Sequence, residues 1–367
     1  MSELPITTIV GGAGFLAGVL FGAVANKTNF CTMGAISDIV FMDDWRRMRA
    51  WLLAIAVAIL TTQAMNTAGM IDTTKAIYLT PNFGWLGAIL GGLLFGFGMT
   101  LAGGCANKTL VRIGGGNLKS IVVLLVVGVF AYMTLRGFIG LGRVQMEAMT
   151  NVNLANHKLA SQGLPDMLAA LTGMAPGIAR WAVAAPLAGG LLVFCFRDRS
   201  FRTSPSNVIA GLVVGLLISL GWWITGVLGN DDFSPTALGS FTFVAPMGDT
   251  LEYLMTYTGA TINFGIAAVG GVIVGSFIVA LATRTFRVEA FKDSADMLRH
   301  FIGAAIMGIG GVLALGCTIG QGITGVSTLA AGSLIALLSI VAGGVLGMKY
   351  LEEGSFSGAL GAVLARN

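Results

Sequence analysis

Residues 91–105 read GGLLFGFGMTLAGGC, and residues 303–317 read GAAIMGIGGVLALGC. The two stretches align without gaps at a shift of 212 positions, and the residues that recur are Gly91, Gly96, Gly98, Leu101, Ala102, Gly104 and Cys105. The first copy lies in an odd-numbered apolar span of the chain and the second in an even-numbered one. Successive membrane spans alternate in direction, so the two copies must point in opposite directions. The pattern therefore predicts an inverted-topology repeat, in which the binding site lies near the bilayer midplane between the two halves.

The composition indicates a membrane protein. Of the 367 residues, 55% are hydrophobic and only 10% are charged, and the mean hydropathy is +0.85. A soluble domain has about 25% charged residues, so this chain has too few charges to cover a soluble surface of its size. The 54 glycines are unfavourable in a soluble helical protein but suit membrane helices that pack closely.

Nine apolar spans of roughly 20 residues predict an all-α integral membrane protein. They cover residues 6–25, 50–70, 84–102, 118–140, 181–197, 206–228, 260–282, 300–316 and 332–349. A weaker match supports the repeat, because Asn29-Phe30-Cys31-Thr32 follows the first span and Asp232-Phe233-Ser234-Pro235 follows the sixth. We therefore expect four helices in each half and one linking helix. The first repeat is expected at 1–141, the connector with its linker helix at 142–205 and the inverted second repeat at 206–367.

The distribution of basic residues predicts the orientation of the chain in the membrane. The connections after odd-numbered spans, together with the C-terminus, contain 16 of the 21 Lys and Arg residues. Basic residues collect on the cytoplasmic side, so we expect a periplasmic N-terminus and a cytoplasmic C-terminus. The net charge of +4 is explained in this way, and we expect no nucleic-acid partner.

Two glycine-rich loops follow the repeated stretches: residues 103–109, GGCANKT, and residues 316–322, GCTIGQG. Non-helical backbone at membrane depth is tolerated only where it is buried in protein or lines a cavity. Glycine also lets backbone N–H groups approach a ligand closely. We expect two re-entrant loops that select a small anion, with candidate site residues Cys31, Cys105, Cys317, Gly104, Asn107, Lys108, Gly316, Thr318, Gln321 and Ser234.

The cysteines indicate which kind of anion passes. A thiol is a weak hydrogen-bond donor and acceptor, so it suits the terminal sulfur of a ligand better than a hard oxyanion such as sulfate. Its contacts are also weak enough to permit release, which conduction requires. The sequence thus favours a relay of thiols for a small anion that has a terminal sulfur. Cys195 lies outside any motif and is expected to be a buried structural residue.

Other interpretations of these residues are open. Buried cysteine often acts as a small hydrophobe, Lys108 could mark the inner membrane boundary, and Asn107 and Gln321 could satisfy loop backbone. The chain could be a membrane-embedded thiol–disulfide enzyme that uses Cys105 and Cys317, although no Cys-x-x-Cys pair is present. It could also be a neutral-solute channel or carry a selenium compound. With four cysteines and two histidines, we expect neither a metal site nor a cofactor.

The cysteine motifs resemble those of the YeeE/YedE family of bacterial inner-membrane sulfur transporters, which includes thiosulfate uptake proteins. The motifs are Phe30-Cys31-Thr32-Met33-Gly34-Ala35, Leu101-Ala102-Gly103-Gly104-Cys105-Ala106 and Leu315-Gly316-Cys317-Thr318-Ile319-Gly320-Gln321-Gly322. The resemblance implies an hourglass-shaped fold of nine helices, in which thiosulfate is handed between thiols by S–H···S contacts. It implies that Cys317 is the outer station, Cys105 the central one and Cys31 the inner one.

The resemblance also implies a partner and shows one departure. Members of the family often work with a small soluble sulfurtransferase of the TusA type, which would receive the sulfur inside the cell. Thiosulfate-importing members usually read Arg-Gly-Arg-Phe-Cys before the first motif cysteine. This chain reads Asn26-Lys27-Thr28-Asn29-Phe30-Cys31 instead, so one basic residue stands where the family has two.

Overall fold

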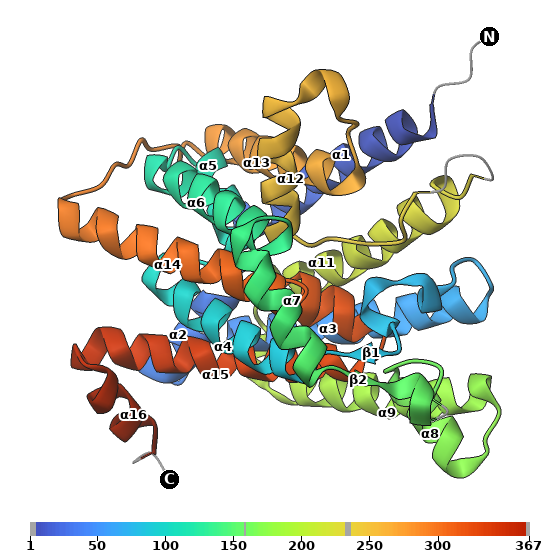
Figure 1. Cartoon of the computed structure of the whole chain (residues 1–367). Coiled ribbons are helices and arrows are strands. Elements are labelled where there is room, and N and C mark those ends of the chain that lie inside the picture. Colours follow the sequence, from blue (N-terminus) through green and yellow to red (C-terminus); the bar gives the residue numbers. More distant parts are fainter. Residues whose placement is uncertain (1–4, 158, 232–235, 365–367) are drawn as a thin grey trace.

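The computed structural model describes residues 5–157, 159–231 and 236–364, and this part of the chain is almost entirely helical (Figure 1). Two short strands, β1 (Asn82–Phe83) and β2 (Val152–Asn153), pair antiparallel. The α-helices are α1 (Ile6–Thr28), α2 (Thr32–Met42), α3 (Arg46–Thr67), α4 (Trp85–Leu101), α5 (Ala106–Gly114), α6 (Leu118–Leu135), α7 (Phe138–Thr150), α8 (Leu164–Thr172), α9 (Pro176–Arg197), α10 (Arg199–Arg202), α11 (Pro205–Trp223), α12 (Val244–Met255), α13 (Phe264–Ala282), α14 (Ser294–Leu313), α15 (Ala331–Glu353) and α16 (Phe356–Leu364).

Short helical segments complete the secondary structure. The π-helices are η4 (Ile224–Leu228) and η6 (Gly320–Gly325), and the 3-10 turns are η1 (Thr73–Lys75), η2 (Ile77–Leu79), η3 (Leu154–His157) and η5 (Tyr257–Gly259).

In the described residues, nine helical segments are long and apolar enough to cross a membrane. They coincide with the nine predicted spans, so the all-α membrane fold is confirmed. The first segment, Ile6–Met42, is longer than predicted because α1 ends near Asn29 and the chain turns directly into α2. In the same way α5 extends the third segment and η4 extends the sixth. Helices suit this environment because they satisfy their own backbone hydrogen bonds.

The two copies of the repeated stretch, α4 and α14, pack antiparallel against each other through glycine. A Cβ on Gly91 would lie 2.7 Å from the Gly310 carbonyl oxygen, and one on Gly310 would lie 2.7 Å from that of Gly91. In the same way, a Cβ on Gly98 would lie 2.7 Å from the Gly303 carbonyl oxygen, and one on Gly303 would lie 2.8 Å from that of Gly98. At the shift of 212, Gly91 corresponds to Gly303 and Gly98 to Gly310. The contact between the copies therefore has local twofold symmetry, with backbone touching backbone.

The remaining long helices pack in matching pairs. Helix α1 packs on α13 and α11 on α3, while α4 packs on α15 and α14 on α6. If spans one to four are mapped onto spans six to nine, the α1–α13 pair becomes the α11–α3 pair, and the α4–α15 pair becomes the α14–α6 pair. The predicted repeat requires this correspondence. The fifth span, α9, packs chiefly on α3. The extension of the repeat to whole halves, the domain boundaries and the re-entrant character of the loops stay predictions.

Candidate functional site

Both repeated helices end in the same backbone turn. Gly103 has φ 71°, and the residue at the corresponding position of the second copy, Leu315, has φ 58°. The N–H of the next residue, Gly104 or Gly316, donates to the carbonyl five residues earlier at 2.9 and 2.7 Å. This is the left-handed helix end that glycine normally provides, and it is unfavourable for leucine. The turn directs the following cysteine away from the axis of the helix that precedes it.

Each motif cysteine begins the next helical turn. The Cys31 sulfur accepts a hydrogen bond from the Gly34 N–H at 3.5 Å, and the Cys317 sulfur accepts one from the Gly320 N–H at 3.3 Å. The thiol of Cys105, the N-cap residue of α5, lies near the backbone N–H of Lys108 but does not accept a hydrogen bond from it. The three residues are 7%, 0% and 0% exposed in the order Cys31, Cys317 and Cys105. All three thiols are thus buried, and backbone N–H groups hold the sulfurs of Cys31 and Cys317.

Side chains of the two loops meet at Cys105. Its thiol interacts with the thiol of Cys31 and lies beside the hydroxyl of Thr318. Thr318 follows Cys317 directly, and the thiol of Cys317 lies beside Thr242. The sequence separates these residues widely, yet the fold brings the side chains of Cys31 and Thr318 to the Cys105 thiol.

Three of the predicted site residues have buried polar atoms that the described residues leave without a hydrogen-bond partner. The atoms are Asn107 Oδ1, Thr318 Oγ1 and Gln321 Oε1. The other amide atom of Gln321, Nε2, donates to the Ala314 carbonyl at 2.5 Å. A buried polar atom without a partner is destabilising by about 1–3 kcal/mol, so native proteins keep few of them and each needs a physical reason. These atoms give the loop region a polar character that apolar packing does not require.

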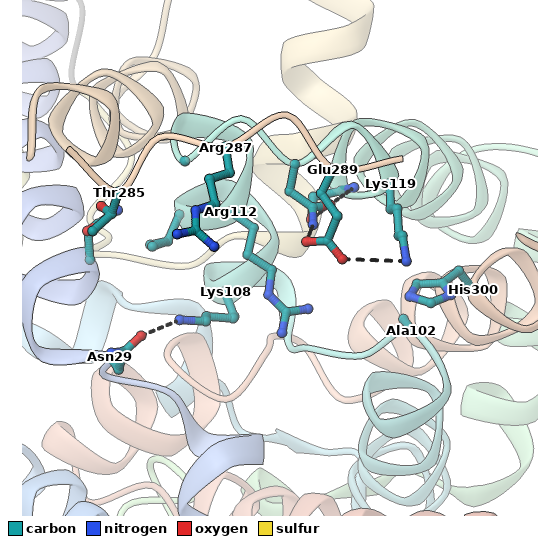
Figure 2. A pocket seen from close by; sticks show the side chains of 14 residues that line it. Asn29, Ala102, Lys108, Arg112, Lys119, Thr285, Arg287, Glu289 and His300 are labelled. Carbon is teal, nitrogen blue, oxygen red and sulfur yellow. Dashed lines mark hydrogen bonds and ion pairs between the residues drawn. The ribbon is translucent and has the colours of Figure 1, made fainter. Parts of the chain in front are cut away.

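A cavity of about 350 Å³ adjoins the Cys105 loop, since Ala102 and Lys108 line it, and it is rich in basic residues (Figure 2). Its basic and acidic lining residues are Lys108, Arg112, Lys119, Arg287, His300 and Glu289. Lys119 is neutralised by Asp296 at 2.9 Å and by Glu289 at 3.6 Å. By contrast, Lys108, Arg112 and Arg287 form no ion pair with any residue that the structure describes. The cavity therefore has an excess of positive charge.

The polypeptide holds these basic groups in place through neutral partners. Lys108 Nζ donates to Asn29 Oδ1 at 3.1 Å, which joins α5 to the turn between α1 and α2 (Figure 2). Arg112 Nη1 donates to the Gly103 carbonyl at 2.5 Å. His300 is held through Nδ1, 2.7 Å from the Asp296 carbonyl, so its Nε2 faces Gly103. The positive charges of Lys108 and Arg112 thus remain uncompensated beside the loop that contains Cys105.

The structure joins three of the predicted residues directly, because the Cys105 thiol contacts Cys31 and Thr318. The other predicted residues neighbour these three in sequence: Gly104, Asn107 and Lys108 flank Cys105, and Gly316, Cys317 and Gln321 flank Thr318. Their role in a common site stays a prediction. Ser234 lies outside the described residues. Cys195 is buried and its thiol donates to the Arg49 carbonyl at 3.3 Å, as expected of a structural residue.

Sequence reasoning missed Arg112 and His300. Arg112 follows Lys108 by four residues, which places both on one face of a helix that starts at Cys105. That spacing could have revealed Arg112. His300 approaches Gly103 only through the packing of α14 on α4, and no local pattern in the sequence indicates it.

Comparisons with known proteins give the family of the chain. A family model described as Sulphur transport matches residues 27–346. The thiosulfate transporter TsuA of Escherichia coli is 29% identical over 327 residues, which cover 85% of this chain and 86% of the relative. TsuA of Spirochaeta thermophila is 27% identical over 324 residues, which cover 86% of this chain and 91% of the relative.

A more limited similarity links the chain to a further transporter. The probable transporter YedE of Salmonella typhimurium is 34% identical over 103 residues, which cover 28% of this chain and 23% of that protein. Because the Sulphur transport model extends over most of the sequence and its cysteine motifs, the chain belongs to the sulphur transport family, as those motifs indicated.

Proposed function

We propose that the chain is a transporter of thiosulfate or a closely related small sulfur-containing anion, and that the anion passes along the thiols of Cys317, Cys105 and Cys31. The observation that carries the proposal is the meeting of side chains at Cys105, whose thiol contacts both the Cys31 thiol and the Thr318 hydroxyl of the second loop. The names of the two full-length relatives support the substrate. These relatives are transporters, and the chain is a transport protein and not an enzyme.

The outer step of the relay uses Cys317. A terminal sulfur that carries negative charge accepts a contact from the Cys317 S–H, and the neighbouring Thr318 hydroxyl offers a second donor. Thr318 Oγ1 is buried without a partner among the described residues, so it is free to donate to a passing anion. Because thiol contacts are weak, the sulfur moves on from Cys317 to Cys105 without a deep energy minimum between them.

The inner step places the two ends of thiosulfate in different surroundings. The terminal sulfur stays with the adjacent thiols of Cys105 and Cys31. The three oxygens face Lys108 and Arg112, whose charges have no carboxylate partner in the described structure. Cationic donors bind oxyanions with charge-assisted hydrogen bonds, which are stronger than those between neutral groups. This arrangement favours a thiosulfate-like anion over sulfide, which has no oxygens, and over sulfate, which has no terminal sulfur.

The same proposal includes the setting in the cell. The chain lies in the bacterial inner membrane with its N-terminus in the periplasm and its C-terminus in the cytoplasm, so the basic cavity opens inward. The two glycine loops enter from opposite faces and meet near the midplane. The local twofold contact between α4 and α14 supports this arrangement. A small sulfurtransferase of the TusA type receives the sulfur at the inner face.

Uptake of radiolabelled thiosulfate into liposomes that contain the purified protein tests the function. We expect saturable uptake that empty liposomes lack. Unlabelled thiosulfate should compete at its own half-saturating concentration, while sulfate, which lacks the terminal sulfur, should compete at least about tenfold more weakly, because about 1.4 kcal/mol of lost binding energy corresponds to tenfold. Sulfite and selenite serve as further competitors. Equal competition by sulfate and thiosulfate would remove the argument for the thiols.

A further inference from the structure

An apolar groove lies between α6 and α12, away from the cysteines. Its volume is about 700 Å³, and its apolar lining residues are Leu125, Val129, Met133, Leu251, Leu254 and Met255. The two helices approach closely at its floor, where a Cβ on Gly128 would lie 2.5 Å from Leu251. Helix α6 is one of the segments able to span the membrane, and Val129, Leu254 and Met255 are half to three-quarters exposed. The groove therefore faces the lipid.

A polar pocket of about 390 Å³ continues the groove at the end of α6. The two share Tyr132, Arg136 and Glu252, and the polar pocket adds Asp249 and Asn263. Arg136 is the residue that caps the C-terminal end of α6. In a span of this length that position lies at the level of the lipid headgroups. The lining thus changes from apolar to charged at the depth where a phospholipid changes from acyl chain to headgroup.

The charges of the polar pocket are of both signs and incompletely paired. Tyr132 donates its hydroxyl to the Glu252 carboxylate. Burial and the nearby Glu252 carboxylate raise the pKa of Asp249, so a positively charged group beside the two carboxylates would be stabilising. The backbone N–H of Arg136 donates to the Tyr132 carbonyl, while its guanidinium group forms no ion pair with another described residue. The pocket therefore offers one cation and, next to it, an anionic pair.

We propose that this groove and pocket bind one aminophospholipid, of the phosphatidylethanolamine type. One of its two acyl chains lies in the apolar groove and the other stays in the bilayer, while the phosphate binds Arg136 and the primary ammonium group binds Glu252 and Asp249. A methylene group occupies about as much volume as a liquid water molecule, about 30 Å³, so the groove has room for one acyl chain of ordinary length. Phosphatidylglycerol has the phosphate but no cation, and the quaternary ammonium of phosphatidylcholine has no N–H to donate.

Native mass spectrometry of the delipidated, full-length protein tests the proposal. Phosphatidylethanolamine, phosphatidylglycerol and phosphatidylcholine with the same acyl chains are added at equal concentration. We expect the wild type to retain phosphatidylethanolamine about tenfold better than the other two, because a lost charge-assisted hydrogen bond weakens binding by that order. Arg136→Gln should lose this retention, while Arg180→Gln, which removes an arginine remote from the groove, should keep it.

A second variant keeps the test informative if Arg136→Gln does not fold. The double change Asp249→Asn and Glu252→Gln removes the anionic pair but leaves Arg136, so phosphatidylethanolamine should lose its advantage over phosphatidylcholine. Equal retention of the three lipids by the wild type would overturn the proposal, as would a preference for phosphatidylglycerol or undiminished retention by both variants. The measurement does not use transport, so its outcome is independent of the proposed function.

Discussion

The loops that follow α4 and α14 begin with the same backbone turn but continue with different helices and side chains. Both begin with a left-handed residue, Gly103 or Leu315, and both place a buried cysteine at the start of the next helical turn. After Cys105 the chain forms α5 with two basic residues, whereas after Cys317 it forms the uncharged π-helix η6. The repeated backbone thus fixes the position of each thiol, and the residues that follow set the charge around it.

The largest effect is expected where the two loops meet. Replacing Cys105 by serine removes the thiol that contacts both Cys31 and Thr318, so initial thiosulfate uptake should fall about 100-fold, which corresponds to about 2.7 kcal/mol. Cys195→Ser is the matched control, since that thiol is also buried but donates only to the Arg49 carbonyl. Uptake by proteoliposomes at equal protein incorporation gives the comparison. Normal uptake by Cys105→Ser would exclude the relay.

The next largest effect is expected at the glycine contact between α4 and α14. In Gly98→Ala the new Cβ would lie 2.7 Å from both the Gly303 carbonyl oxygen and the Met307 backbone nitrogen. Overpacking of this kind destabilises by about 1–3 kcal/mol, so thermal unfolding in detergent should move to lower temperature. The control is Gly12→Ala, because a Cβ there meets no atom within 4 Å. An unchanged transition for Gly98→Ala would mean that α4 and α14 do not depend on this close approach.

The charge difference between the loops predicts a selective effect on binding. Arg112→Gln removes one cation beside the loop that contains Cys105. The half-saturating concentration of thiosulfate should rise about tenfold, because a hydrogen bond to a charged group contributes about 1.5–3 kcal/mol. Arg112→Lys should restore part of the affinity. Arg46→Gln serves as the control because that exposed arginine pairs with Asp44 outside the cavity. If Arg46→Gln and Arg112→Gln weaken uptake equally, the cavity is not a specific site.

The smallest effect concerns the two left-handed positions themselves. Gly103→Ala should lower the free energy of unfolding by about 1–2 kcal/mol, because an L side chain is strained there. Leu315→Gly should change it by less than about 1 kcal/mol, since relief of strain is offset by greater freedom of the unfolded chain. Chemical denaturation in mixed micelles measures both. If Gly103→Ala and Leu315→Gly lowered the free energy of unfolding by the same amount, the two residues would not share a left-handed conformation that favours glycine.

The sequence predicted the spans well and the site only in part. Nine long apolar runs are enough to locate membrane helices, because each must satisfy its backbone in lipid. Helix α5 was not predicted as part of a span, since Lys108 and Arg112 interrupt the apolar pattern. The contact between the Cys31 and Cys105 thiols depends on the packing of distant helices, and so does the position of His300. Local sequence patterns do not contain that information.

The contact between α4 and α14 limits how the transporter can open. Many secondary transporters move one half against the other as a rigid body. Here the carbonyl oxygens of Gly91, Gly98, Gly303 and Gly310 lie so close to the facing backbone that a sliding movement would push side chains into main chain. Such a rigid central pair acts as a fixed frame. We therefore expect access to the thiols to depend on side chains at the edges of that frame, such as Lys108 and Asn29, which form a hydrogen bond to each other.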